Sequence, residues 1–314
     1  MYCNKSDATE LELVVLLIIR LFRNLIITIF ETVLLSFANQ TIMKNNYLLR
    51  IIDSYFEEIT AYEGDLFTIK EVLKHYEKHI DFDSIRTDSL MELISTFRDP
   101  TIKGSGVNLF TTGHNYSLNK DNFKVSLERL QSRESLFVFS QIYESFESYM
   151  KSILSEFFSK NPTYLDRAPL FQSLFSESQN YKSFINKLRG RDRNNKKLLW
   201  TFRKLSPYYS RFELNNNFNY SYNIWFDLIS DVRHRVIHNR QTASLAFINT
   251  LSENNKESIF NRYFEVKKEG SKSLIITDQM KMGQLIHEWN QYAFFIFKAL
   301  SLELELDTHY RVIG

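Results

Sequence analysis

Cysteine is almost absent from this sequence, which has a single one, Cys3, among 314 residues. One cysteine excludes an intramolecular disulfide framework, a four-cysteine zinc site and a CxxC redox motif. A reducing cytosol is the simplest compartment for such a chain, so we expect a cytoplasmic protein. Glycine and proline are also scarce, with 8 and 4 residues, and their scarcity favours helices.

A long uncharged apolar run is also missing, although residues 11–42 are strongly apolar. Arg20 and Arg23 interrupt this segment, so no uncharged stretch reaches the roughly 18–20 residues that a membrane span requires. The charges before it are mainly acidic, unlike those of a secretory signal. We therefore expect no membrane association. Three interpretations stay open for residues 1–42: a membrane anchor, a buried helix, and a start codon assigned upstream of the true one at Met43.

The net charge of +2 hides an uneven distribution of charge along the chain. Residues 1–128 carry 13 Lys and Arg against 18 Asp and Glu, which leaves 26 against 19 in residues 129–314. Residues 181–240 alone carry 13 basic and 4 acidic side chains. Such a basic stretch attracts a polyanion, or is simply a solvated face.

The first third of the chain predicts helices followed by a loop. Apolar residues recur at intervals of three and four in residues 44–62 and 66–97, which is typical of amphipathic helices. Three of the eight glycines fall between residues 104 and 113, so we expect a loop or domain junction over residues 99–118. Residues 43–118 therefore form the expected N-terminal helical region with its glycine-containing loop.

Residues 119–314 predict a helical bundle with one small hairpin. Apolar residues at alternating steps of three and four predict a long helix over residues 129–160, which Asn161-Pro162 ends. Further helices are expected from Tyr222 and over residues 278–304, and a β-hairpin is expected around Gly270. The predicted fold class is all-α, a helical bundle with a small β-hairpin insertion and an N-terminal helical region.

The helix near residue 230 carries the candidate chemistry. Its apolar stripe is formed by Trp225, Ile229, Val232 and Val236. At 100° per residue, four titratable residues project together from nearly the opposite side, namely Asp227, Asp231, His234 and His238. Arg233 lies about 140° around the helix from His238. The two therefore share one cleft only if it wraps around the helix, and a second protein surface facing this helix would build such a cleft.

At these residues the sequence resembles the HEPN family of helical-bundle proteins. The family's signature is Arg, then a polar residue, three more residues and His. Residues 233–238, Arg-His-Arg-Val-Ile-His, fit every specified position of it. The order of elements, a long helix, a basic segment, the motif helix and a long last helix, also fits, and the resemblance covers residues 119–314.

The resemblance implies a metal-independent endoribonuclease that acts as a homodimer, with two copies of the motif facing a shared cleft. It implies that Arg233 and His238 are the catalytic pair, that His234 fills the variable polar position, and that no cofactor or metal is needed. Many bacterial members resemble toxins or phage-defence effectors, so an antitoxin or a defence-system protein is an expected partner. Other members lack nuclease activity, and an inactive module that binds RNA or protein is the alternative.

The same residues suit RNA cleavage on chemical grounds. Histidine titrates near neutral pH and can exchange protons with the 2′-hydroxyl and the leaving 5′-oxygen. Arginine is always charged and can hold phosphate oxygens in a bidentate pair as negative charge develops. RNA is the expected substrate, and its backbone would be bound by basic residues of the run and the motif, namely Arg189, Arg191, Arg193, Lys196, Lys197 and Arg235.

Three other interpretations of these residues stay open. The histidines could be surface residues that complement the helix dipole at a basic helix end. His234 and His238, with Asp227 and Asp231, could ligate zinc, although the neighbouring arginines would repel a cation. The chain could also be a membrane-anchored interaction protein that uses residues 11–42.

Two further groups of residues carry titratable side chains. Glu144 and Glu147 lie on the polar side of the 129–160 helix and could face the motif helix, or be solvated surface. The remaining five histidines show no companion at a ligand-like spacing, so we expect them to be surface or satisfied residues. They are His75, His79, His114, His287 and His309.

Overall fold

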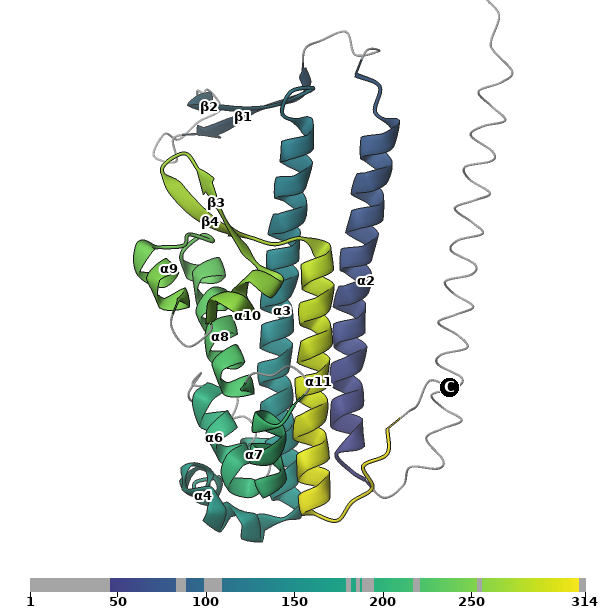
Figure 1. Cartoon of the computed structure of the whole chain (residues 1–314), viewed down its shortest axis with the longest axis vertical. Helices are drawn as coiled ribbons and strands as arrows, with labels where there is room; N and C mark the ends of the chain where they lie inside the picture. Colours follow the sequence, from purple (N-terminus) through teal and green to yellow (C-terminus); the bar gives the residue numbers. More distant parts are fainter. Residues whose placement is uncertain are drawn as a thin grey trace, which may run out of the picture. The chain divides into compact units, whose positions relative to one another are not determined.

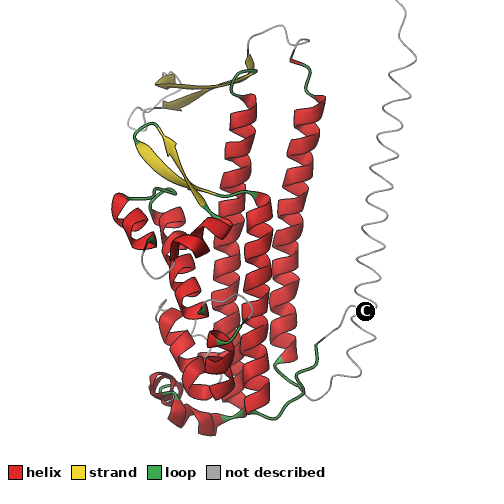
Figure 2. Cartoon of the chain, viewed as in Figure 1, coloured by secondary structure: helices red, strands yellow, loops and turns green. Residues whose placement is uncertain are grey.

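A computed structural model describes residues 46–82, 89–98, 109–178, 182–184, 187, 195–216, 221–252 and 256–310. Leu48–Glu305 form one compact unit, which contains every element named below. It is mostly helical, with two separate two-stranded hairpins (Figure 2). The expectation of a mainly helical bundle with a small hairpin is therefore confirmed at this coarse level.

Three long helices form the frame of the unit. They are α2 (Leu49–His79), α3 (Phe123–Lys160) and α11 (Gln279–Glu303), and they pack against one another side by side (Figure 1). The shorter helical elements cover the side of α3 and α11 away from α2. These are η2 (Pro162–Arg167), α4 (Pro169–Ser176), α6 (Asn195–Leu205), α7 (Pro207–Leu214), α8 (Tyr222–His238), α9 (Leu245–Leu251) and α10 (Lys256–Tyr263).

The helices with a continuous apolar stripe are confirmed. The expected helix over 129–160 is the C-terminal part of α3, and Asn161 is its C-cap. The helix expected from Tyr222 is α8, and the last expected helix is α11 with Asp278 as its N-cap. Each stripe forms a buried face because apolar side chains leave water where helices pack.

The hairpin expected around Gly270 is also confirmed. Strands β3 (Glu265–Glu269) and β4 (Lys272–Ile276) pair antiparallel, with Glu265 opposite Ile276 and Glu269 opposite Lys272. Gly270 lies in the turn with a φ of 59°, a left-handed conformation that glycine adopts without steric cost.

The prediction for residues 66–118 was partly wrong. Helix α2 ends at His79, and strands β1 (Ser89–Arg98) and β2 (Leu109–Asn119) form an antiparallel hairpin where a helix end and a loop were expected. The helical period in this region stops at Ile80, the C-cap of α2. Beyond it, β-branched and aromatic residues favour strands. The register shifts of β1 interrupt the regular alternation of apolar and polar residues that would have indicated a strand in the sequence.

Aromatic side chains from α3, α8 and α11 make up the centre of the core. The Trp289 ring lies 4.4 Å from that of Phe146 and 4.7 Å from that of Trp225, measured between ring centroids. All three side chains are fully buried. Such aromatic pairs add roughly 0.5–1.5 kcal/mol beyond the area they bury, so they fix α8 firmly against the two long helices.

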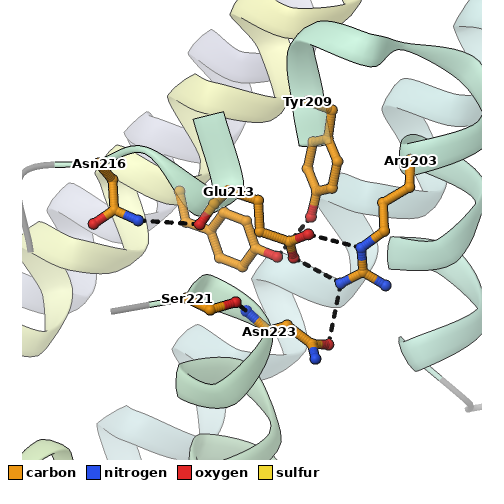
Figure 3. Close-up of polar contacts among 7 residues, drawn as sticks. Arg203, Tyr209, Glu213, Asn216, Ser221 and Asn223 are labelled. Carbon is orange, nitrogen blue, oxygen red and sulfur yellow. Dashed lines mark hydrogen bonds and ion pairs between the residues drawn. The ribbon is translucent and has the colours of Figure 1, made fainter. Parts of the chain in front are cut away.

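A polar network joins α6, α7 and α8 (Figure 3). The Arg203 guanidinium donates to both carboxylate oxygens of Glu213 at 2.7 Å and to Asn223 Oδ1 at 3.1 Å. Beside it, the hydroxyl groups of Tyr209 and Tyr292 lie 2.6 Å apart, and burial raises the pKa of both. The network is internally paired, which indicates a role in holding helices together.

The apolar segment 1–42 lies outside the described residues. Among the helices that are described, none is both long and apolar enough to cross a membrane.

Candidate functional site

Helix α8 presents one buried side and one accessible side. Its N-cap is Ser221, whose side chain accepts a hydrogen bond from the backbone N–H of Asn223. Trp225, Ile229 and Val232 of the expected stripe are buried, whereas Val236 is only half-buried. The stripe thus weakens in the last turn, where the helix leaves the core and carries its basic residues.

The accessible side of α8 carries the two motif histidines. His234 and His238 are exposed, and their ring centroids lie 4.8 Å apart. Asp231 is also exposed, and Asp227 is half-buried. Neither histidine has a hydrogen-bond or ion-pair partner within the described part of the chain, so both rings are available to a ligand.

Arg233 turns away from the histidines and towards α3. Its Nη2 donates to Glu144 Oε1 at 2.8 Å, and its guanidinium carbon lies 5.5 Å from the centroid of the Tyr143 ring. Arg233 is mostly covered, with 23% of its side chain exposed, while Glu144 is 55% exposed. A single chain therefore holds Arg233 and His238 on different sides of α8.

Arg235 is directed towards α9. Its guanidinium carbon lies 4.2 Å from the centroid of the Phe247 ring, a cation–π distance, and its Nη1 lies 3.4 Å from Ser244 Oγ. The contacts with Phe247 and Ser244 fix the position of the guanidinium. It keeps further N–H donors, so Arg235 can bind a phosphate from that position at the end of the helix.

The turn after α8 is held by the β3–β4 hairpin. The carbonyl oxygen of Gln241 accepts a hydrogen bond from the Ile275 backbone N–H at 2.8 Å. The carbonyl oxygen of Ser273 accepts one from the Ala243 backbone N–H, also at 2.8 Å. Arg240 and Gln241 both have positive φ, 50° and 65°. Non-glycine residues adopt this conformation only where their surroundings fix it.

The expected RNA-contacting run is only partly described. Arg189, Arg191 and Arg193 lie outside the described residues. Lys196 and Lys197 lie in the first turn of α6, whose backbone alone is described there. Their role as RNA contacts stays a prediction.

The acidic residues considered in the sequence separate into two cases. Glu144 faces the motif helix through its ion pair with Arg233, whereas Glu147 Oε1 pairs within α3 with Lys151 Nζ at 2.7 Å. The covering of Arg233 by Tyr143 was not anticipated, because Tyr143 is part of the apolar stripe of α3. Its hydroxyl lies 2.9 Å from Ser230 Oγ, so it reaches α8 from the core side.

All five remaining histidines are exposed, as expected, but the prediction that none has a companion at a ligand-like spacing was wrong for two of them. His75 and His79 are four residues apart on α2, and their ring centroids lie 4.1 Å apart in a stacked arrangement. The spacing of four residues on a helix was the overlooked signal. No arginine lies within four residues of this pair in the sequence, which distinguishes it from the pair on α8.

The structure does not bring potential zinc ligands together in the described part of the chain. Within the described residues, no group of three or more His, Cys, Asp or Glu side chains is arranged so that it could hold a metal ion.

Comparison with known proteins gives no relative to which the site could be matched. No protein-family model, no curated protein and no solved structure shows a significant match to this chain.

Proposed function

We propose that the protein is a metal-independent endoribonuclease of the HEPN type that cleaves RNA with the Arg-His motif of α8. The observation that carries the proposal is the pair of exposed histidine rings, 4.8 Å apart and without protein partners among the described residues, on a helix end that carries Arg233 and Arg235. Exposed, unpaired imidazoles beside several guanidinium groups suit proton transfer at a phosphodiester.

The reaction would use the RNA's own 2′-hydroxyl as the nucleophile. One histidine accepts the 2′-hydroxyl proton while its oxygen attacks phosphorus, and a protonated histidine donates to the 5′-oxygen as its bond to phosphorus breaks. The products are a 2′,3′-cyclic phosphate and a 5′-hydroxyl, which balances atoms and protons without a metal. Guanidinium groups stabilise the negative charge on the phosphate oxygens.

The direction of Arg233 favours a site built from two chains. Because Arg233 reaches towards α3 and His238 is exposed elsewhere on the helix, one phosphate cannot easily use both from the same chain. A two-fold dimer through the accessible side of α8 would bring two copies of the motif to one axis. An endoribonuclease of this kind in the cytoplasm fits a toxin or phage-defence effector, held in check by an antitoxin or a defence-system partner.

A ribonuclease assay with EDTA present tests the proposal. Wild-type protein is expected to cleave single-stranded or structured RNA, and His234→Ala/His238→Ala is expected to slow cleavage by about 10²–10⁴-fold. The matched control is His75→Ala/His79→Ala, which removes the other stacked pair and should leave the rate unchanged. Equal cleavage by the wild type and the α8 variant would refute the proposal.

A catalytically silent RNA-binding module is the second candidate. The ion pair between Arg233 and Glu144 favours it, because this pair occupies the arginine that catalysis would need. The same protein preparations separate the two candidates: RNA binding without cleavage in any condition would identify the silent module.

A further inference from the structure

An open cleft of about 610 Å³ lies between α3 and the β3–β4 hairpin, close to the end of the motif helix. The first part of α3 forms one wall, including Val125 and Arg133, and the hairpin forms the other. The turn after α8 contributes Arg240 and Gln241. The proposed ribonuclease site does not use this cleft.

Most acidic groups of the cleft are already engaged. Glu269 pairs with Arg129 at 2.9 Å, and Glu265 pairs with Lys281. The Asp278 carboxylate accepts the backbone N–H of Lys281 at 2.9 Å as the N-cap of α11. The two ion pairs compensate the charges of Glu269 and Glu265, whereas Asp278 keeps its negative charge.

Three basic side chains at the cleft remain available. Arg133, Arg240 and Lys267 are exposed, and none of them has an ion-pair partner within the described residues. Two acids among the lining residues have no cationic partner in the described part of the chain, Glu128 and Asp278, against these three cations. The groups without partners therefore leave an excess of positive charge, which attracts an anion.

Apolar side chains complete the lining. Val125, Leu274 and Ile276 contribute to it, and none of the three is fully buried. A cleft that combines apolar surface with a few convergent charged groups is typical of a small-molecule site. Its ligand should combine a flat or apolar part with a strong anion.

The backbone fixes the position of Arg240. The turn that carries it pairs with β4 through Gln241 and Ala243, as described above, and keeps a φ of 50° at Arg240 itself. Strained residues held in place in this way cluster at functional sites. Arg240 is also only two residues beyond His238, so the cleft and the motif share one helix end.

We infer that this cleft binds a nucleotide unit. Its phosphate contacts Arg133, Arg240 and Lys267, and its base lies against the apolar wall. The unit comes either from a free nucleotide or from an RNA strand, since both present the same phosphate and base. Binding at this cleft is independent of RNA cleavage.

Equilibrium binding to the full chain tests this inference. The probes are AMP and a short 2′-O-methyl oligoribonucleotide, which cannot be cleaved through its 2′ position, and both are measured in the His234→Ala/His238→Ala background. Arg133→Ala/Arg240→Gly/Lys267→Ala removes the three charges, and glycine suits the positive φ at residue 240. The control removes three exposed cations of α3 and the β3–β4 hairpin that do not line the cleft, with Lys124→Ala/Lys268→Ala/Lys272→Ala.

The cleft variant should weaken binding by at least about tenfold, because charge-assisted hydrogen bonds to phosphate are lost, while the control stays within about twofold. Loss for AMP and the oligonucleotide alike identifies a free-nucleotide site, and loss for the oligonucleotide alone identifies an RNA subsite. Binding of neither probe, or an equal loss in the control variant, overturns the inference. These outcomes do not depend on whether the protein cleaves RNA.

Discussion

The Glu144 carboxylate is the negative charge nearest to Arg233, with an oxygen 2.8 Å from Nη2. It lowers the attraction of this guanidinium for phosphate, because the two opposite charges partly cancel. The pair adds little to stability, since Glu144 is more than half exposed and exposed pairs contribute about 0–1 kcal/mol. Its effect should therefore fall on RNA binding.

Glu144→Gln should tighten RNA binding by about threefold at low salt, with the gain fading as salt rises. The gain should vanish in the Arg233→Ala background, because Glu144 acts through that arginine. Dissociation constants for the four proteins of this double-mutant cycle provide the check. Weaker binding by Glu144→Gln would instead mean that Glu144 positions Arg233 for the ligand.

Sequence periodicity predicts which side of α8 each motif residue takes, because a helix fixes the direction of side chains every 100°. It therefore placed His234 with His238 and Arg233 apart from them. It could not predict that Arg233 meets Tyr143 and Glu144, since those contacts depend on how α3 packs against α8. The cleft beside Arg240 was equally hidden, because its walls are more than 100 residues apart in the sequence.

At the scale of elements, continuous apolar stripes were the reliable signal. The stripe of α3 and that of α11 each correspond to a helix with a buried face, and the turn glycine at 270 marks a hairpin. Strands β1 and β2 escaped prediction because their hydrophobic alternation is broken by register shifts and most of their large apolar side chains are exposed. A strand that buries little leaves a weak pattern in the sequence.

The Arg203–Glu213 pair should be a stabilising contact between α6 and α7. Glu213 is 5% exposed and Arg203 27% exposed, so Glu213→Gln leaves a half-buried guanidinium without its counter-charge. The expected loss is about 2 kcal/mol in the free energy of unfolding, below the usual figure for a buried pair because Arg203 keeps some contact with water. Urea unfolding followed by circular dichroism measures it.

The control for this prediction is the Arg167–Glu303 pair, in which Arg167 is 53% exposed. Glu303→Gln should cost less than about 1 kcal/mol. Equal losses in the two variants would show that the Glu213 network has no special role in holding the helices together.

The basic run that leads into α6 should account for much of the salt dependence of RNA binding. Each phosphate neutralised on a single strand contributes about −0.7 to the slope of log affinity against log salt, because condensed counterions are released. Neutral replacements at five positions should flatten the slope, namely Arg189, Arg191, Arg193, Lys196 and Lys197. Binding titrations between low and high salt measure it.

The matched comparison replaces exposed lysines of α2, namely Lys70, Lys74 and Lys78. These lie on a different helix and should leave the slope as it is in the wild type. A slope that stays unchanged when the basic run is neutralised would identify the run as solvated surface.

At the scale of the whole molecule, the proposed site requires a homodimer through the accessible side of α8. Ile237 is 44% exposed beside His238, an apolar group suited to such an interface. Light scattering should therefore give twice the chain mass of 37.4 kDa, and Ile237→Glu should shift the protein towards monomer and reduce cleavage. Met280→Glu, at an exposed apolar residue of α11, should do neither.

A second result would support the shared site. Arg233→Ala and His238→Ala protomers, each inactive alone, should regain part of the activity when mixed, because one of the two sites can combine an intact arginine with an intact histidine. A monomer that still cleaves RNA would contradict the two-chain site.

The chemistry of the RNA ends distinguishes cleavage by the histidines of α8 from every other source of RNA loss. RNA is incubated with the wild-type chain in EDTA, and the product ends are identified by mass spectrometry. Attack by the 2′-hydroxyl, assisted by the histidines of α8, predicts 2′,3′-cyclic phosphate and 5′-hydroxyl ends that disappear with His234→Ala/His238→Ala. Intact RNA with the wild type, 3′-hydroxyl ends, or the same products from the variant would contradict the account.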